Sequence, residues 1–144
     1  MKPTFTNAET YLADHGIAPT LQRIAVIDDL YSHRTHATAD EILERLCSRY
    51  PKFTQRTVYN ALNLFVEKGL VSELNIDGVS ARYDFDTRFH GHFRCTHCGR
   101  IFDFAMCRPA ADGVPCGRVE SAQYYAYGVC RTCSDNEMEQ KNEH

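Results

Sequence analysis

Apolar residues recur at helical spacing in the stretch "TQRTVYNALNLFVEKG", residues 54–69. Val58, Ala61, Leu62 and Phe65 fall at positions i, i+3, i+4 and i+7, which places them on one face of an α-helix. Gly69 follows the last apolar position, and glycine is a common residue at a left-handed helix C-terminus. The pattern predicts a helix over residues 54–68 with one buried face.

Three further helices are predicted upstream. The stretch "NAETYLADHG" predicts a short helix that begins at Asn7 and is closed by Gly16. Residues 20–32 predict a second helix. A third starts with Thr38 and Glu41 at capping-box spacing and is ended by Pro51. The positions expected to be apolar and buried are Leu21, Ile24, Ala25, Ile27, Leu30 and Tyr31, then Ile42, Leu43, Leu46 and Tyr50, with Cys47 as a small core residue.

A β-hairpin is predicted after the fourth helix. Two alternating runs in "LVSELNIDGVSARYDFD", residues 70–86, flank Asp77-Gly78, which is a signal for a two-residue hairpin turn. In the second run Val79, Ala81, Tyr83 and Phe85 are expected to share one face. Helices followed by a hairpin indicate a winged helix-turn-helix, with residues 54–68 as the recognition helix.

The pattern changes from Thr87 onward to short strands rich in Cys, His, Gly and aromatic residues. The final stretch "SDNEMEQKNEH" is polar and is predicted to fray. The expected fold class is therefore α+β, with an N-terminal winged helix-turn-helix followed by a smaller domain.

Composition and charge add two constraints. The start of the 144-residue chain is polar, and no apolar run approaches the roughly 20 residues that span a bilayer, so a cytoplasmic protein without a membrane partner is expected. A net charge of −3 gives no support to a nucleic-acid partner. Residues 45–56 nevertheless contain four basic residues and no acidic one, which makes a local basic patch.

The polar face of the predicted recognition helix carries Gln55, Arg56, Tyr59, Asn60 and Asn63. Amide, guanidinium and phenol groups are the kind that read base edges in DNA. The alternative is a polar face that only meets water. The order of helices and hairpin, together with the basic stretch, favours DNA reading.

Seven cysteines in a chain expected in a reducing compartment indicate metal binding rather than disulfides. Cys95 and Cys98 form one CxxC pair, and Cys130 and Cys133 form another, so together they offer the four sulfurs of a structural zinc site. Residues 99–129 are longer than a zinc-ribbon spacer, which predicts a small subdomain between the pairs. A thioredoxin-like redox role is the alternative, but neither pair follows a βαβ pattern.

Nitrogen and oxygen ligands form a second candidate set. His90 and His92 are two residues apart and face the same side of a strand, and Asp103 follows in the next strand. His36 lies before the third helix, and Asp84 ends the hairpin. Mixed histidine and carboxylate sites suit Fe²⁺, Mn²⁺ or Zn²⁺. The alternatives are a solvated His36 and an Asp84 that pairs with Arg82 or Arg88.

These motifs together resemble the ferric uptake regulator (Fur) family of metal-responsive bacterial repressors. The segments "HATADEI", "TVYNALNLFVEKGLV", "ARYDF", "HGHFRCTHCGRIFDF" and "YGVCRTCS" match its pattern in order, over residues 16–134. The resemblance implies a winged-helix DNA-binding domain over residues 1–84 and an α/β dimerisation domain over residues 85–144. It also implies a homodimer that binds an inverted-repeat operator in double-stranded DNA.

The resemblance also implies roles for the ligands. The four cysteines would hold structural Zn²⁺, and His36, Asp84, His90, His92 and Asp103 match the regulatory ligands for Fe²⁺ or Mn²⁺, with Zn²⁺ also possible there. Aspartate at both carboxylate positions resembles the peroxide-stress branch, in which Fe²⁺ reacts with hydrogen peroxide and a histidine ligand is oxidised. His36 and His90 match the oxidisable positions. The residues assigned to DNA contact are Lys52, Gln55, Arg56, Thr57, Tyr59, Asn60 and Asn63.

Two departures from the family pattern stand out. Leu21 occupies a position where the family usually has proline. The segment "AMCRPAADGVPCGRVESAQYY", residues 105–125, replaces a longer helical stretch, which changes the expected dimer contact and argues against a third metal site. Within it, Cys107 and Cys116 are interpreted as loop thiols, with a redox pair, haem binding and a second zinc as alternatives.

Two readings lie outside the family. A small zinc hydrolase would use His90, His92 and an aspartate, but it needs an open coordination position and a general base. A zinc-ribbon interaction module would leave the polar face of residues 54–68 unexplained. We therefore expect a non-enzymatic DNA-binding regulator.

Overall fold

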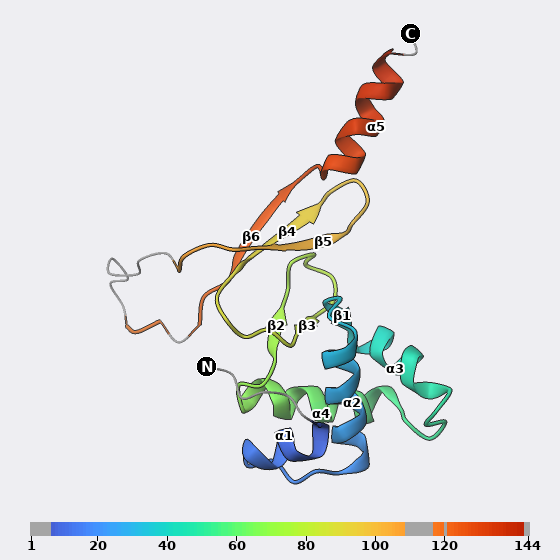
Figure 1. The fold of residues 1–144 in the computed structure, drawn as a ribbon, viewed down its shortest axis with the longest axis vertical. Helices are drawn as coiled ribbons and strands as arrows, with labels where there is room; N and C mark the ends of the chain where they lie inside the picture. Colours follow the sequence, from blue (N-terminus) through green and yellow to red (C-terminus); the bar gives the residue numbers. More distant parts are fainter. Residues whose placement is uncertain (1–6, 109–116, 120, 143–144) are drawn as a thin grey trace. The chain divides into compact units, whose positions relative to one another are not determined.

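A computed structural model describes residues 7–108, 117–119 and 121–142, which fall into two compact units, Met1–Thr87 and Arg88–His144 (Figure 1). The first unit contains α1 (Ala8–Asp14), α2 (Leu21–Ser32), β1 (Ala37–Thr38), α3 (Ala39–Cys47), α4 (Gln55–Glu67), β2 (Ser72–Leu74) and β3 (Arg82–Asp84). The second contains β4 (Gly91–Cys95), β5 (Ile101–Phe104), β6 (Tyr124–Gly128) and α5 (Arg131–Asn142). The α+β class expected from the sequence is confirmed.

Threonine residues set the starts of the three longer helices of the first unit. The hydroxyls of Thr20, Thr38 and Thr54 each accept a hydrogen bond from the backbone N–H three residues later, at 3.3, 3.2 and 3.2 Å. The side chain of Glu41 accepts a hydrogen bond from the backbone N–H of Thr38, so the predicted capping box is confirmed. Each cap satisfies an N–H that the helix itself cannot pair.

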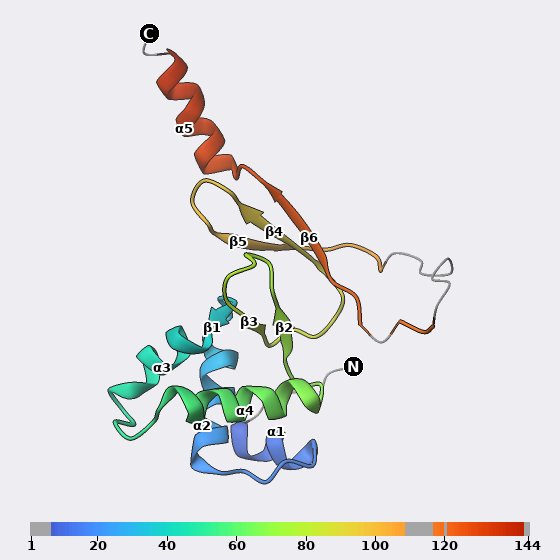
Figure 2. The same ribbon diagram turned by 180° about the vertical axis from the view of Figure 1, so that it is seen from behind.

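Helix α2 lies at the centre of the helical core and contacts α1, α3 and α4 (Figure 2). Because neighbours surround it, burial extends beyond one stripe to Val26, which the sequence pattern did not single out and which is fully buried. Leu21 was expected on the buried stripe, but it is the first residue of α2 and is 56% exposed. Cys47 was also expected in the core, and its side chain is exposed at the last residue of α3.

Helix α4 follows its predicted pattern. Val58, Ala61, Leu62 and Phe65 are all buried, and Gly69 follows the helix with a φ of +76°. The opposite face is exposed to solvent at the positions predicted to be polar, which are Gln55, Arg56, Tyr59, Asn60 and Asn63. The helix therefore buries its apolar row and leaves the polar row at the surface.

The wing differs from the predicted hairpin. Leu74 pairs with Arg82, so residues 75–81 form the connecting loop, and the predicted two-residue turn at Asp77-Gly78 is wrong. The carboxylate of Asp77 accepts bonds from the backbone N–H groups of Val79 and Ser80 at 2.9 and 3.1 Å, which replaces the tight turn with an aspartate-capped loop. Val79 is 87% exposed as a result, rather than sharing a buried face with Tyr83.

A third strand completes the wing sheet. Ala37 pairs with Tyr83 and Thr38 with Arg82, which gives the order β1-β3-β2 with antiparallel pairing on both sides of β3. Strand β1 is only two residues long, and no alternating pattern marked it in the sequence. Its pairing with β3 brings the residues directly after His36 alongside the strand that ends in Asp84.

The second unit is built on a three-stranded sheet with the order β5-β4-β6. Strand β4 pairs antiparallel with β5 and parallel with β6. Helix α5 follows β6 where a frayed tail was expected (Figure 1). The backbone N–H of Ser134 donates to the carbonyl of Cys130 at 2.9 Å, so the helix begins directly after Cys130. The residues that follow include Glu, Met, Gln and Lys, which favour a helix.

Part of residues 105–125 lies outside the described residues, including Pro109, Gly113, Pro115 and Cys116. Cys107, which the structure does describe, is exposed. Among the described residues, every helix is too short or too polar to cross a lipid bilayer.

Candidate metal centres and nucleic-acid interface

The two CxxC pairs meet in the second unit. Cys95 ends β4, Cys98 lies in the turn that follows, and Cys130 and Cys133 lie at the start of α5. The four sulfur atoms all lie within 4.8 Å of one another, and Cys98 Sγ is 3.8 Å from Cys130 Sγ. This four-sulfur cluster matches the ligand set of a structural zinc ion. Two distant turns of the chain are thereby brought to one point, as the spacing predicted.

Backbone donors prepare one of the sulfurs as a thiolate. The N–H groups of Cys98 and Cys130 donate to Cys95 Sγ at 3.4 and 3.3 Å. These bonds lower the pKa of Cys95 to about 5. Hydrogen bonding with the Cys130 thiol and burial raise the pKa of Cys133 to about 12. Zinc binding must therefore displace protons from this cluster, which weakens binding in acid.

Two contacts hold the turn between Cys95 and Cys98 in place. Gly99 has a φ of +75°, and its N–H donates to the carbonyl of Cys95 at 2.9 Å. His97 Nδ1 lies 3.1 Å from a carboxylate oxygen of Glu137 in α5. His97 is therefore outside the sulfur cluster and pairs with α5, the helix that contains Cys133.

His36 and Asp84 come together within the first unit. His36 Nε2 lies 3.5 Å from Asp84 Oδ2, and both side chains are less than a tenth exposed. The alternative of a solvated His36 is thus wrong, because the pairing of β1 with β3 carries this loop against the end of β3. The other oxygen of Asp84 accepts from the N–H of Asp86 at 2.9 Å, which fixes the carboxylate.

His90, His92 and Asp103 form a second set within the second unit. His92 and Asp103 are directly opposite on β4 and β5, and His90 immediately precedes β4. Asp103 Oδ1 lies 3.6 Å from Nε2 of each histidine. His90 Nδ1 lies 2.6 Å from the carbonyl oxygen of Arg88, so Nδ1 carries the proton and Nε2 is available as a ligand atom.

Gly91 separates the two histidines because an aromatic ring occupies the space of a side chain there. Phe104 pairs with Gly91 across the sheet, and a Cβ on Gly91 would overlap the Phe104 ring. Phe104 is held in turn by an edge-to-face contact with Tyr124, with the ring centroids 6.0 Å apart. A side chain at this position would therefore displace the Phe104 ring or strand β4, which carries His92.

Gly91→Ala should destabilise the second unit by about 1–3 kcal/mol, because overpacking forces the Phe104 ring or strand β4 to move. Chemical denaturation followed by circular dichroism measures the change. Gly128→Ala is the matched control in the same sheet, since its Cβ would approach the Phe93 ring only to 3.3 Å. A Gly91→Ala protein as stable as the wild type would show that Phe104 moves aside without cost.

The exposed face of α4 differs from the predicted DNA face in two details. The side-chain amide of Gln55 donates to Asp40 Oδ1 at 2.7 Å, and the Thr57 hydroxyl lies 3.0 Å from that of Thr54. Both groups therefore have partners within the first unit. Lys52 is exposed in the turn before α4. Burial raises the pKa of Tyr83 to about 12, with smaller contributions from Glu73 and Tyr59.

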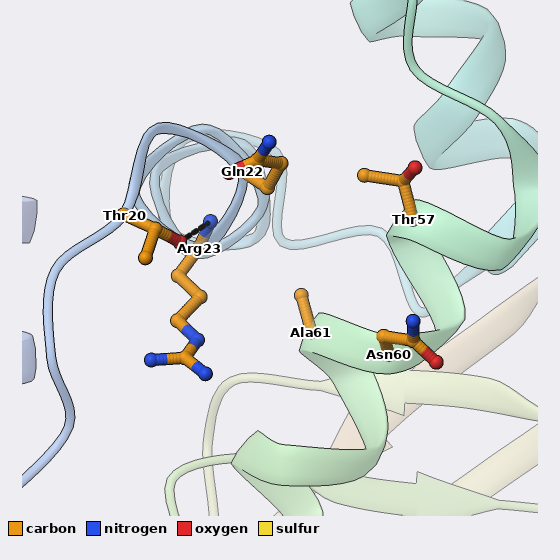
Figure 3. Close-up of a pocket in the computed structure, with 6 residues that line it drawn as sticks. All are labelled: Thr20, Gln22, Arg23, Thr57, Asn60 and Ala61. Carbon is orange, nitrogen blue, oxygen red and sulfur yellow. Dashed lines mark hydrogen bonds between the residues drawn. The ribbon is translucent and has the colours of Figure 1, made fainter.

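A polar groove of about 290 Å³ lies beside this face (Figure 3). It is lined by Thr20, the residue that caps α2, by Gln22 and Arg23 from the first turn of α2, and by Thr57, Asn60 and Ala61 from α4. The sequence reading missed Gln22 and Arg23, because only the packing of α2 against α4 places them next to Asn60. The capping threonine at position 20 was the one available signal, since it marks where α2 begins.

Comparison with known proteins agrees with the pattern of motifs. The family model of the "Ferric uptake regulator family" matches residues 14–111. The "Peroxide operon regulator" of Bacillus subtilis is 37% identical over 131 residues, which cover 88% of this chain and 90% of that protein.

Two solved structures are similar in fold. The Helicobacter pylori ferric uptake regulator Fur gives a TM-score of 0.67 at 22% identity, with 88% of each chain covered. PerR from Streptococcus pyogenes, described for peroxide sensing and gene regulation, gives 0.51 at 27% identity, with 88% of this chain and 93% of that chain covered. The family match, the curated relative and these folds agree with one another: this chain belongs to the ferric uptake regulator family.

Proposed function

We propose that this protein is a metal-dependent transcriptional repressor that releases its operator when peroxide oxidises a histidine ligand of bound Fe²⁺. The observation that carries the proposal is the set formed by His90, His92 and Asp103, whose ligand atoms lie within 4.8 Å of one another. Two histidines and one carboxylate are the ligands of non-haem Fe²⁺ sites that leave coordination positions open. The Bacillus subtilis relative is named as a peroxide operon regulator, which supports the same function.

We assign His36 and Asp84 to the same regulatory ion. Three protein ligands leave a six-coordinate cation incomplete, and His36 and Asp84 already form a buried pair of the matching chemistry. Together the five residues offer three imidazole nitrogens and two carboxylates, and no sulfur. Such a set holds Fe²⁺ or Mn²⁺, and Zn²⁺ would compete wherever it is available, because it binds most nitrogen and oxygen sites more tightly.

The four-sulfur cluster would hold structural Zn²⁺ and take no part in sensing. Its four protein ligands complete a tetrahedral shell, so no position remains for another ligand. In this assignment Cys95, Cys98, Cys130 and Cys133 fix the fold of the second unit, and the histidine and aspartate residues respond to the signal.

We assign residues 1–84 to DNA binding and residues 85–144 to dimerisation and metal binding. A homodimer reads an inverted repeat when its two recognition helices are held at the separation of the half-sites. In this proposal α4 enters the major groove and Lys52 meets phosphate. The contact set is Lys52, Gln55, Arg56, Thr57, Tyr59, Asn60 and Asn63, to which the groove in Figure 3 adds Gln22 and Arg23.

Tyr59→Ala should weaken operator binding by about 1–3 kcal/mol and leave binding to random DNA nearly unchanged. Tyr59 is 37% exposed on α4, where its ring can contact a thymine methyl group. Fluorescence anisotropy with operator and scrambled duplexes measures the difference, and Tyr59→Phe serves as the control that keeps the ring. Equal losses on both duplexes would mean that Tyr59 supports only the fold.

Metal would act as an allosteric effector in this scheme. It must bind the DNA-competent conformation more tightly, and DNA must then tighten metal binding by the same factor. The cation also adds positive charge to a chain whose net charge is −3. Bound Fe²⁺ would supply the redox chemistry that activates hydrogen peroxide, and the imidazole that gains an oxygen atom would be the net source of the two electrons. The protein itself would supply the imidazoles of His36 and His90, and oxidation of either imidazole would weaken metal binding.

The test is operator binding by protein loaded with Fe²⁺, Mn²⁺ or Zn²⁺, before and after hydrogen peroxide. We expect all metal-loaded forms that populate the five-residue site to bind DNA, and only the Fe²⁺ form to release it after peroxide. An Fe²⁺ form that stays bound after peroxide would instead favour an iron- or zinc-responsive uptake regulator of the same family. Metal-independent DNA binding would contradict the whole proposal.

A further inference from the structure

We propose that Arg82 is a positioning residue that holds the His36 loop in its metal-binding conformation and ties it to the wing. This inference rests on the proposed assignment of His36 as a regulatory metal ligand. Arg82 begins strand β3, and its side chain is about one fifth exposed. The residue was noted in the sequence only as a possible partner of Asp84, and the structure gives it different contacts.

The guanidinium of Arg82 bridges three segments of the first unit. Its Nη1 donates to the backbone carbonyl of His36 at 3.1 Å, and its Nε donates to Asp77 Oδ2 at 3.2 Å. Nη1 also lies 3.8 Å from a carboxylate oxygen of Glu41, the residue that completes the cap of α3. The planar fork of arginine suits this bridge, because its donors point in fixed and different directions.

The backbone conformation of His36 requires contacts of this kind to stabilise it. Its φ is +54°, and it is the one non-glycine residue with a positive φ in the part of the chain that the structure describes. Left-handed backbone is unfavourable for a residue with a Cβ and persists where surrounding contacts fix it. Arg82 binds the carbonyl of His36, and Asp84, two residues along the same strand, faces its imidazole. Relaxation of φ would swing Nε2 away from Asp84.

Strand β3 thus holds this segment at three consecutive residues. Between the contacts of Arg82 and Asp84 with His36, Tyr83 pairs with Ala37 in the sheet. Loss of the Arg82 contact frees the end of the segment that enters the left-handed conformation, while the pairing of Ala37 keeps the other end in place. The expected consequence is a misplaced imidazole in a folded unit.

Asp77 anchors the other side of Arg82. The carboxylate is fixed by the N–H groups of Val79 and Ser80, and these bonds, together with Arg82, lower the pKa of Asp77. Asp77 therefore remains charged at neutral pH and keeps Arg82 oriented. The side chain of Arg82 therefore links Asp77 in the wing loop to the backbone of His36, the proposed metal ligand.

Mn²⁺ affinity of the dimeric, zinc-containing protein tests the inference without peroxide chemistry. Arg82→Gln should weaken Mn²⁺ binding about 10- to 100-fold, the usual effect of removing a group that orients a metal ligand. One zinc per chain should remain. Arg82→Lys keeps the charge but cannot bridge both acceptors, so it should restore part of the affinity. Arg100→Gln is the matched control, because the Arg100 guanidinium packs over the Phe102 ring instead.

Two further measurements separate positioning from a general loss of stability. In a His36→Ala background, Arg82→Gln should weaken Mn²⁺ binding by less than about twofold, because residues that act through one contact are not additive. In metal-free protein, hydrogen exchange of the peptide that contains residues 36–38 should be faster in Arg82→Gln than in the wild type. That readout does not depend on metal at all.

The outcomes divide cleanly. Mn²⁺ affinity that falls with His36→Ala but not with Arg82→Gln overturns the role of Arg82 and leaves the ligand assignment standing. An equal loss from Arg82→Gln with and without His36 also overturns it, because Arg82 would then act on the whole unit. An affinity that His36→Ala leaves unchanged removes His36 from the regulatory site, and the inference falls with that assignment.

Discussion

Replacing Cys98 with serine should abolish zinc binding and unfold residues 88–144. Within the described part of that unit, the buried apolar side chains are limited to Cys95 and Cys130, both of which belong to the four-sulfur cluster. A unit of this size whose described residues form no apolar core depends on a crosslink or a metal for its stability. Structural zinc contributes roughly 10–16 kcal/mol of apparent binding free energy to comparable small domains, far more than the sheet can replace.

The measurement combines zinc content by elemental analysis with hydrogen exchange of the two units. We expect rapid exchange in peptides from β4, β6 and α5 of Cys98→Ser, while helices α2 and α4 stay protected by their own core. Cys107→Ser is the matched control, because Cys107 is an exposed cysteine of the same unit outside the cluster. A Cys98→Ser protein that keeps one zinc per chain and slow exchange would contradict the structural role.

The predictable parts of the fold are those specified by nearby residues. The apolar positions of α4 recur within one helix, and the Thr38–Glu41 capping box spans one turn, so both were readable and both are confirmed. The wing loop could not be predicted from its turn residues. The Asp77 carboxylate accepts hydrogen bonds from two backbone N–H groups, and this arrangement replaces the tight turn. Leu21 was misplaced for a different reason, since burial of α2 depends on which neighbours reach its first turn.

The candidate ligands likewise include some that local spacing marks and others that only the fold brings together. Spacing within the sequence was enough to single out the CxxC pairs and the two histidines on either side of Gly91. His36 and Asp84 are 48 positions apart, and strand β1, which joins them, carries no pattern of its own. The role of Arg82 depends on contacts between elements that are distant in sequence. The same holds for Gln22 and Arg23, for which the capping Thr20 was the one local signal.

Brief treatment of the Fe²⁺-loaded protein with hydrogen peroxide should oxidise His36 or His90 and release the operator, whereas the Mn²⁺-loaded protein should remain bound. In the net reaction one oxygen atom of peroxide is added to an imidazole carbon and the other leaves as water. Peptide mass spectrometry detects the added oxygen, and anisotropy on the same samples measures DNA release. His33 serves as an internal control, because it faces Asp29 rather than either proposed ligand set.

The length of the carboxylate at position 103 should set this sensitivity. Asp103 Oδ1 lies 3.6 Å from Nε2 of both His90 and His92, so one extra methylene shifts the carboxylate relative to both imidazoles. Asp103→Glu should keep Mn²⁺-dependent operator binding and lose most of the histidine oxidation under peroxide, with Asp135→Glu, on the exposed side of α5, as the matched control. If wild-type histidines stay unmodified and Fe²⁺-loaded protein keeps its operator, peroxide is not the signal. If Asp103→Glu is oxidised as fast as the wild type, the carboxylate does not tune the reaction, and the sensitivity must come from the histidines themselves.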